Sequence, residues 1–129
     1  MTIGNFSFQD CHSLTSITIP NCVTSIGVCA FQNCTSLTTI YIGNSIKTID
    51  NAAFSNCPEI TDVFCFAKNV PETNNNVFLN SYTDYATLHV PQGSINHYKE
   101  SEPWKNFKNI VKIDMPEHSL IYIIDNEVH

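Results

Sequence analysis

The feature that most constrains this chain is a repeat of 23 residues. Five positions recur at this offset in three consecutive blocks. The recurring sets are Ile3, Ile26 and Ile49; Phe8, Phe31 and Phe54; Cys11, Cys34 and Cys57; Leu14, Leu37 and Ile60; and Ile17, Ile40 and Val63. A unit this short cannot bury its apolar side alone, so consecutive copies must stack and share one interior. The repeat therefore predicts a solenoid in which equivalent side chains form columns.

One half of each copy predicts a short strand. In the copy with the clearest pattern, residues 26–43, β-branched and polar residues alternate toward the end of the copy. Leu37, Ile40 and Ile42 are expected to point inward, and Thr39 and Tyr41 outward. Copies stacked in parallel about 4.8 Å apart would satisfy one another's backbone groups. We therefore expect a parallel β-sheet along one face of the solenoid.

The other half of each copy predicts the opposite wall. In residues 26–34 an alanine precedes Phe31, which leaves room for a column of stacked phenylalanines. We expect a turn and one irregular helical turn here, with the phenylalanine rings packed face over edge. The cysteine column should lie in the interior, where a buried thiol behaves as a small apolar side chain. The spacing of the six cysteines therefore favours neither a disulfide framework nor a zinc site.

Residues 1–90 are predicted to hold about four copies of the repeat, the last of them degenerate. After Cys65 the register slips, and Phe78 then takes the place of Phe54. The expected inward set of this copy is Tyr85, Leu88 and Val90. Terminal copies of a repeat array are commonly atypical, which agrees with this slip.

Residues 91–113 are predicted to form a C-terminal cap, and residues 114–129 a tail or the start of another module. Ser94 is a candidate N-cap for a short helix. The side chains expected to cover the last copy are Tyr98, Trp104 and Phe107. No polar capping element precedes Ile3, so we expect a segment of a longer chain whose open N-terminal face can associate end to end.

The charge of the chain excludes several classes of partner. Its net charge is −6, with six lysines and no arginine, and only 14% of its residues are charged. Nucleic acids and anionic membrane surfaces are bound by basic faces, so neither is expected here. No stretch is long and apolar enough to predict membrane insertion, and no signal peptide opens the chain.

The repeat resembles a known family. The pattern I-G-x-x-A-F-x-x-C-x-S-L-x-x-I-x-I over residues 26–42 is similar to the BspA-like leucine-rich repeats of bacterial cell-surface proteins. Residues 86–113 are similar to the segment that closes such arrays, so the resemblance covers residues 3–113. It implies an α/β leucine-rich-repeat solenoid with a parallel β-sheet on one face, turns and short irregular helices on the other, and a C-terminal cap. It also implies a cell-surface or secreted location, a role in adhesion, and no catalytic residues.

The tail carries a second, shorter resemblance. Residues 120–129 are similar to the first strand of a Listeria–Bacteroides type β-repeat, with matches at Tyr122, Asp125 and Val128. Asn126 stands where that motif has glycine. The alternative interpretation is an extra strand or a mobile extension of the solenoid.

The outward-facing strand residues form the candidate binding site. Thr18, Tyr41, Phe64 and His89 should form one row, and Ser16, Thr39, Asp62 and Thr87 a second. The predicted binding residues are Thr18, Tyr41, Phe64, His89, Thr39 and Asp62. Exposed aromatic rings beside hydroxyl and carboxylate groups suit a peptide or a sugar. The alternative is that these residue types simply suit a sheet surface.

These observations favour a non-catalytic recognition or adhesion module. His89 and Asp62 are expected on adjacent strands, but the nearby Cys65 should point inward, so no nucleophile meets a base. No cofactor or metal motif is present in the sequence. The expected partner is a host or matrix protein or a glycan. The alternative function is a structural spacer with no ligand of its own.

Overall fold

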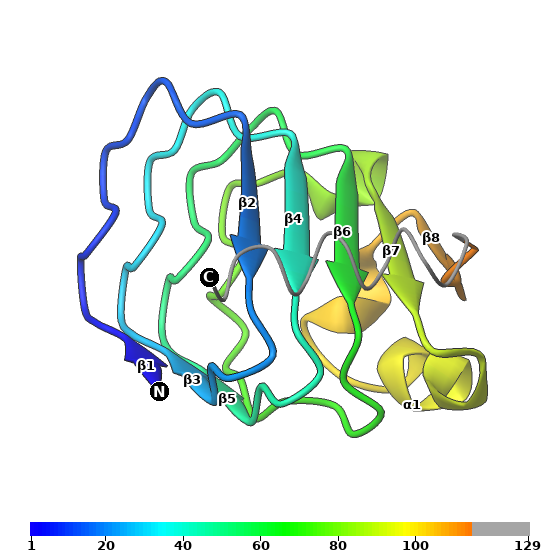
Figure 1. Cartoon of the computed structure of the whole chain (residues 1–129). Coiled ribbons are helices and arrows are strands. Elements are labelled where there is room, and N and C mark those ends of the chain that lie inside the picture. The colour runs from blue at the N-terminus through cyan, green and yellow to red at the C-terminus, as the bar shows by residue number, and fades with distance from the viewer. Residues whose placement is uncertain (115–129) are drawn as a thin grey trace.

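The computed structural model describes residues 1–114, which form a solenoid with two parallel sheets around one core (Figure 1). The larger sheet has the strand order β2 (Ser16–Ile19), β4 (Thr39–Ile42), β6 (Asp62–Cys65), β7 (Thr87–Val90) and β8 (Asn109–Lys112). The smaller sheet consists of β1 (Thr2–Ile3), β3 (Ser25–Ile26) and β5 (Thr48–Ile49). Every pairing in both sheets is parallel. The predicted solenoid fold is therefore confirmed.

The 23-residue offset appears directly in the strand register. Ile17 pairs with Ile40, and Ile40 pairs with Val63. All three lie on the inner side of the sheet, and Ile40 and Val63 are completely buried. Since side chains alternate across a strand, Thr39 and Tyr41 lie on the outer side, as predicted.

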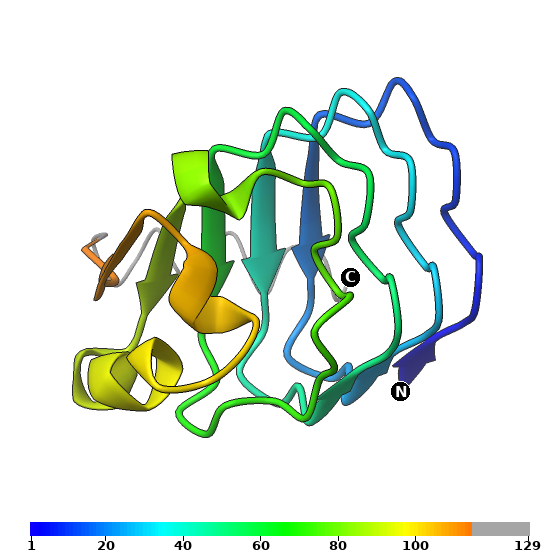
Figure 2. The same cartoon turned by 180° about the vertical axis from the view of Figure 1, so that it is seen from behind.

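The wall opposite the large sheet consists of turns rather than the irregular helical turn expected in each copy (Figure 2). Alternate backbone N–H groups donate to the next copy, as Phe6 N does to Val28 O at 2.9 Å and Phe8 N to Ala30 O at 2.8 Å, while Ser7 N and Gln9 N close turns within their own copy. A helical turn would use these groups within one copy, so bonding between copies prevents it. The turns also require left-handed backbone at non-glycine residues, including Cys29 (φ 54°) and Asn33 (φ 61°).

The phenylalanine column stacks face to face, so the expected face-over-edge packing is wrong. The rings of Phe8 and Phe31 lie 5.1 Å apart at 2°, and those of Phe31 and Phe54 lie 5.3 Å apart at 4°. Phe78 continues the column at 5.7 Å and 13°. Equivalent residues of a repeat have the same backbone and the same side-chain rotamer. Translation by one strand spacing therefore produces an offset stack, whereas an edge-on pair would need two different rotamers.

The cysteine column lies inside, as predicted. Cys34 and Cys57 are buried, and Cys11 is partly buried at the open end of the solenoid. The Cys34 thiol donates to Phe8 O at 3.3 Å, and the Cys57 thiol donates to Phe31 O at 3.2 Å. Its hydrogen bond to Cys34 and its burial raise the pKa of Cys57, which keeps this thiol protonated. All six cysteines, which lie within the described part of the chain, are free thiols.

The degenerate copy contains two extra residues, so Asp62 pairs with Thr87 at an offset of 25. One extra residue lies in the corner between β6 and the bridge from Thr48 to Glu72. The other forms part of the 3₁₀ helix Thr83–Tyr85, which turns Tyr85 outward. Tyr85 is 76% exposed, so its predicted inward position is wrong. Ala86 is buried together with Leu88 and Val90, as the inward set that follows this helix.

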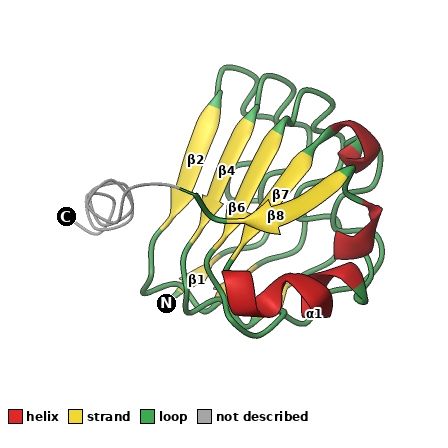
Figure 3. Cartoon of the chain, turned by 90° about the vertical axis from the view of Figure 1, so that its right-hand side faces the viewer, coloured by secondary structure: helices red, strands yellow, loops and turns green. Residues whose placement is uncertain are grey.

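Short helices follow β7 and lead into β8 (Figure 3). They are the 3₁₀ helix Gln92–Ser94, helix α1 (Ile95–Lys99) and the 3₁₀ helix Trp104–Asn106. Trp104 and Phe107 meet the ring of Phe78 edge-on, at 5.5 and 5.3 Å. These three aromatic rings close the phenylalanine column at this end. Ser94 precedes α1 as predicted, but its hydroxyl donates to Lys68 O at 2.7 Å and does not cap the helix.

The N-terminal end of the column is open. Phe8 is 44% exposed there, and Ile3, Leu14 and Ile17 are only partly buried. Within residues 1–114, none of the helices has the length or the apolar character that crossing a bilayer requires. The predicted β-repeat in residues 120–129 lies outside the described residues.

Candidate binding face

The large sheet places the predicted site residues in two rows on its outer side. Thr18, Tyr41, Phe64 and His89 follow one another through the pairings Thr18–Tyr41, Tyr41–Phe64 and Phe64–His89. Beside them run Ser16, Thr39, Asp62 and Thr87. The structure therefore brings all six predicted residues onto one face, because their copies keep the same strand register.

Three rings of the first row stack on one another. The rings of Tyr41 and Phe64 lie 4.9 Å apart at 17°, and those of Phe64 and His89 lie 4.0 Å apart at 8°. Both faces of the Phe64 ring are therefore covered by its neighbours. The stack presents ring edges to solvent, and the ring of Tyr41 keeps one face open on the side of the smaller Thr18.

His89 and Asp62 form a polar pair beside this stack. His89 Nε2 lies 2.9 Å from Asp62 Oδ1, with 19% of the histidine and 41% of the aspartate side chain exposed. The Thr61 hydroxyl donates to Asp62 Oδ2 at 3.1 Å. Both carboxylate oxygens therefore have partners, which fixes the orientation of the pair.

Cys65 does not reach this pair. Its thiol lies in the core, 3.4 Å from the Tyr98 hydroxyl, and burial raises its pKa. A protonated thiol on the inner side of the sheet cannot serve as a nucleophile for a base on the outer side. Within the described range, no three His, Cys, Asp or Glu side chains gather into a potential metal site.

A third outward row was missed by sequence reasoning. It continues the alternation one residue beyond each strand, at Pro20, Gly43, Phe66, Pro91 and Ile113, of which Gly43 is buried and has no side chain. Backbone bonds continue the pairing this far: Gly43 N donates to Ile19 O, Phe66 N to Ile42 O, and Ile113 N to Val90 O, at 2.8 to 3.0 Å. The signal was present in the sequence, because the inward–outward alternation continues to these positions.

Strand β8 was also missed as a member of the face. Its pairing with β7 places Val111 beside His89 and Asn109 beside Thr87. The strand face, defined here as the outward residues of these three rows on all five strands, is almost free of charge. Asp62 and His89 are its only acidic and basic residues, and they pair with each other.

Comparisons with known proteins agree with this geometry. Residues 1–128 match the BspA type leucine rich repeat region, in six copies. No curated protein sequence matches the chain. A leucine rich cell surface protein from Faecalibacterium prausnitzii A2-165 has a similar fold, with a TM-score of 0.61 and 21% sequence identity. The match covers 95% of this chain and 32% of that protein.

The leucine rich repeat protein of T. pallidum also has a similar fold. Its TM-score is 0.53 at 20% identity, and the match covers 88% of this chain and 63% of that protein. The chain therefore spans about a third of the F. prausnitzii protein and somewhat less than two thirds of the T. pallidum protein. At these identities the two structures show a shared fold.

Proposed function

Because the chain belongs to the BspA type leucine rich repeat family, we propose that its strand face is a non-catalytic recognition surface for a protein partner at the cell surface. The family and the fold are typically non-catalytic and indicate a protein-interaction or adhesion-type module. The surface location is supported by the F. prausnitzii protein, which is described as a cell surface protein.

The composition of the strand face carries this proposal. Tyr41, Phe64 and Phe66 place three aromatic rings on a field of hydroxyl and small side chains, with one internally paired acid and base. The buried centres of protein interfaces are likewise rich in aromatic residues and poor in charge. Burying such a face against a partner costs little desolvation of charged groups.

The geometry of the stack favours a polypeptide over a sugar. A sugar ring packs its C–H groups against an open aromatic face. Here the faces of Phe64 are covered at 4.9 and 4.0 Å, which leaves no room for a ligand between the rings. Ring edges and a tyrosine hydroxyl instead suit the side chains and carbonyl groups of a protein surface. Only the outer face of Tyr41 remains open to a sugar.

The size of the strand face predicts weak binding by one copy of the chain. Five strands with four-residue pairing span roughly 19 by 13 Å, or about 250 Å². A standard protein interface buries about 800 Å² on each partner. A stable complex therefore needs adjoining surface or several modules bound at once. This small area is the observation that keeps the alternative of a structural spacer open to test.

The test compares binding before and after removal of the two central rings. The chain is displayed in many copies on fluorescent beads and applied to immobilised extracellular matrix proteins and to a glycan array. We expect binding to a protein, reduced about tenfold or more by Tyr41→Ser with Phe64→Ser, since aromatic residues dominate interface energy. Circular dichroism verifies that the variant is folded.

The matched control removes two exposed aromatic rings outside the strand face, through Tyr82→Ser and Tyr85→Ser. Protein binding that survives loss of Tyr41 and Phe64 contradicts the proposal. Binding to glycans alone points to the open face of Tyr41. The absence of binding across both panels supports the spacer.

A further inference from the structure

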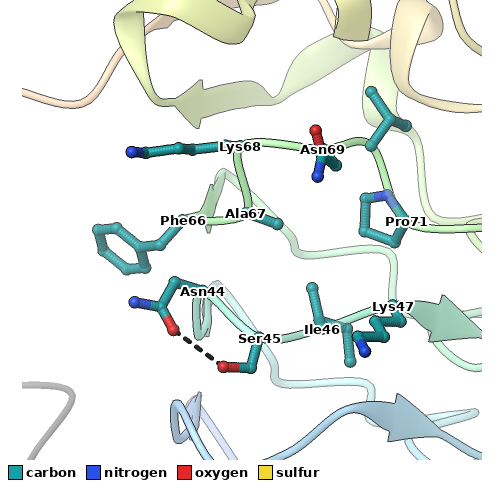
Figure 4. A pocket seen from close by; sticks show the side chains of 10 residues that line it. Asn44, Ser45, Ile46, Lys47, Phe66, Ala67, Lys68, Asn69 and Pro71 are labelled. Carbon is teal, nitrogen blue, oxygen red and sulfur yellow. Dashed lines mark hydrogen bonds between the residues drawn. The ribbon is translucent and has the colours of Figure 1, made fainter.

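The 23-residue period fails at one corner of the solenoid, and a groove opens there. The corner that follows β6 is one residue longer than the corner that follows β4. Asn44 lies in the corner that follows β4, and its backbone N–H donates to Asn21 Oδ1 in the corner that follows β2, at 2.8 Å. This bond joins the two copies. Asn44 Oδ1 does not repeat this bond; it accepts from the Ser45 hydroxyl at 3.1 Å. The two corners therefore separate, with a groove of about 520 Å³ between them (Figure 4).

The groove has an aliphatic floor and a basic rim. The apolar lining comes from Ile46, Ala67 and Pro71, which are buried, and from the half-buried Val70, while Asn69 is an exposed lining residue of the corner that follows β6 (Figure 4). Lys47 and Lys68 flank it, one from each corner. Among its ten lining residues there is no carboxylate. Phe66 lies at one end of the groove and also belongs to the strand face.

The corner that follows β6 is held in place by the helices between β7 and β8. The Tyr98 hydroxyl donates to Ala67 O at 2.7 Å, and the Ser94 hydroxyl donates to Lys68 O at 2.7 Å. On the other side, Glu72 N donates to Lys47 O at 2.8 Å. These three bonds fix both ends of the longer corner. The groove is therefore formed before any ligand arrives, which lowers the entropic cost of binding.

The charges around the groove are distinctive for this chain. The protein carries a net charge of −6, yet two of its six lysines flank this groove. Within residues 1–114, no carboxylate lies at ion-pair distance from Lys47 or Lys68. A neighbouring hollow adds His97 beside Lys68, together with one acid, Glu100. The groove itself is thus a basic, partly apolar site on an acidic protein.

We propose that this groove binds a polypeptide segment that carries a carboxylate next to an aliphatic side chain. The aliphatic side chain lies beside Ile46, Val70 and Pro71, and the carboxylate pairs with the ammonium group of Lys47 or of Lys68, which lie at opposite ends of the groove (Figure 4). An acidic sugar would satisfy the lysines equally well. The aliphatic floor, however, matches a leucine or isoleucine better than a hydroxyl-rich ring. This site differs from the strand face and does not depend on it.

The test is a titration of the ¹⁵N-labelled chain with short capped peptides, followed by two-dimensional NMR at low salt. The probes are acetyl-Leu-Glu-Leu-amide, its glutamine analogue acetyl-Leu-Gln-Leu-amide, and methyl glucuronide as the sugar acid. We expect saturable shifts at the amides of Asn44, Ser45, Ala67 and Asn69 with the glutamate peptide. The glutamine peptide should bind about fivefold more weakly, because it lacks the exposed ion pair with a lysine.

Two variants locate the binding. Lys47→Gln with Lys68→Gln should weaken the glutamate peptide about fivefold, while Lys99→Gln with Lys108→Gln, which changes the net charge equally but lies outside the groove, should leave it unchanged. Asn69→Glu places a negative charge at an exposed position of the groove, where it repels the carboxylate of the peptide, and should abolish the amide shifts. The proposal is overturned if both peptides bind equally well or if the amide shifts lie away from the groove. It is also overturned if the two double-lysine variants lose the same affinity for the glutamate peptide. Stronger binding of methyl glucuronide overturns the choice of a peptide.

Discussion

A single side chain in this protein takes its environment from the equivalent residue one copy away. Phe31 is 2% exposed and stacks on Phe8 and on Phe54. The same translation places Ile40 between Ile17 and Val63. Removal of one such residue therefore leaves a cavity that three copies share.

We expect Phe31→Ala to lower the free energy of unfolding by about 3–5 kcal/mol, because a fully buried ring is replaced by a void. Phe8→Ala should cost clearly less, since Phe8 is half exposed and stacks on one ring only. Urea denaturation followed by circular dichroism measures both. Equal losses for the two variants would mean that stacking on both sides contributes little.

At this scale the sequence predicted which residues are buried better than how they pack. The inward positions of Leu37, Ile40 and Ile42 follow from alternation alone. The parallel rings of the phenylalanine column depend on identical rotamers, which a sequence does not state. Tyr85 shows the other kind of miss, because the extra residue in the 3₁₀ helix Thr83–Tyr85 turned it outward while the apolar pattern stayed the same.

Among the structural elements, the length of each strand determined whether the sequence could predict it. The four-residue strands β2, β4, β6 and β7 carry a readable alternation, and they place the predicted binding residues. The strands of the smaller sheet have two residues each, too few to show any period. The groove was unforeseen because it arises from one extra residue, whose effect depends on what the neighbouring corner does.

Tyr98 on α1 connects the helical end to the solenoid. Its hydroxyl donates to Ala67 O at 2.7 Å inside the core. Tyr98→Phe leaves this carbonyl without its donor, and we expect a loss of about 1–3 kcal/mol in stability at neutral pH. Thermal or urea denaturation measures it. Ser101→Ala is a matched control, because it removes a hydroxyl bond of similar length (2.8 Å, to His97 O) on the exposed side.

The same variant tests the alkaline limit. Burial raises the pKa of Tyr98 in the folded state above its ordinary value of 10.0. An acid whose pKa is raised by folding favours the folded state fully only below its unfolded pKa, and stability falls as the pH rises above that value. The native protein should therefore lose stability above pH 10, and Tyr98→Phe should lose less over the same range. An identical pH dependence in both proteins would exclude Tyr98 as a cause.

Across the whole of residues 1–114, the solenoid is covered at one end and open at the other. The three rings of Phe78, Trp104 and Phe107 close the C-terminal end. At the N-terminal end, a hollow of about 280 Å³ lies among Ile3, Phe8, Leu14 and Ile17. The edge strands β1 and β2 also leave backbone groups there without a strand partner in residues 1–114.

The predicted end-to-end association should therefore join two open N-terminal ends about a two-fold axis, since the other end is covered. Sedimentation velocity should show a mass that rises with concentration toward that of a dimer. Phe8→Ser should return the protein to a monomer, and Tyr85→Ser, which removes a more exposed aromatic ring elsewhere, should not. A mass independent of concentration would contradict this prediction.

The direction of the backbone bonds has a mechanical consequence. Every strand pairs with the copy before or after it, so these bonds lie along the solenoid axis and not across it. Tension applied along that axis would unfold the terminal coil first, while the other coils stay folded. Each 23-residue coil that unfolds would add roughly 80 Å to the length of the extended chain. Under such a load the chain should therefore lengthen in steps of one coil.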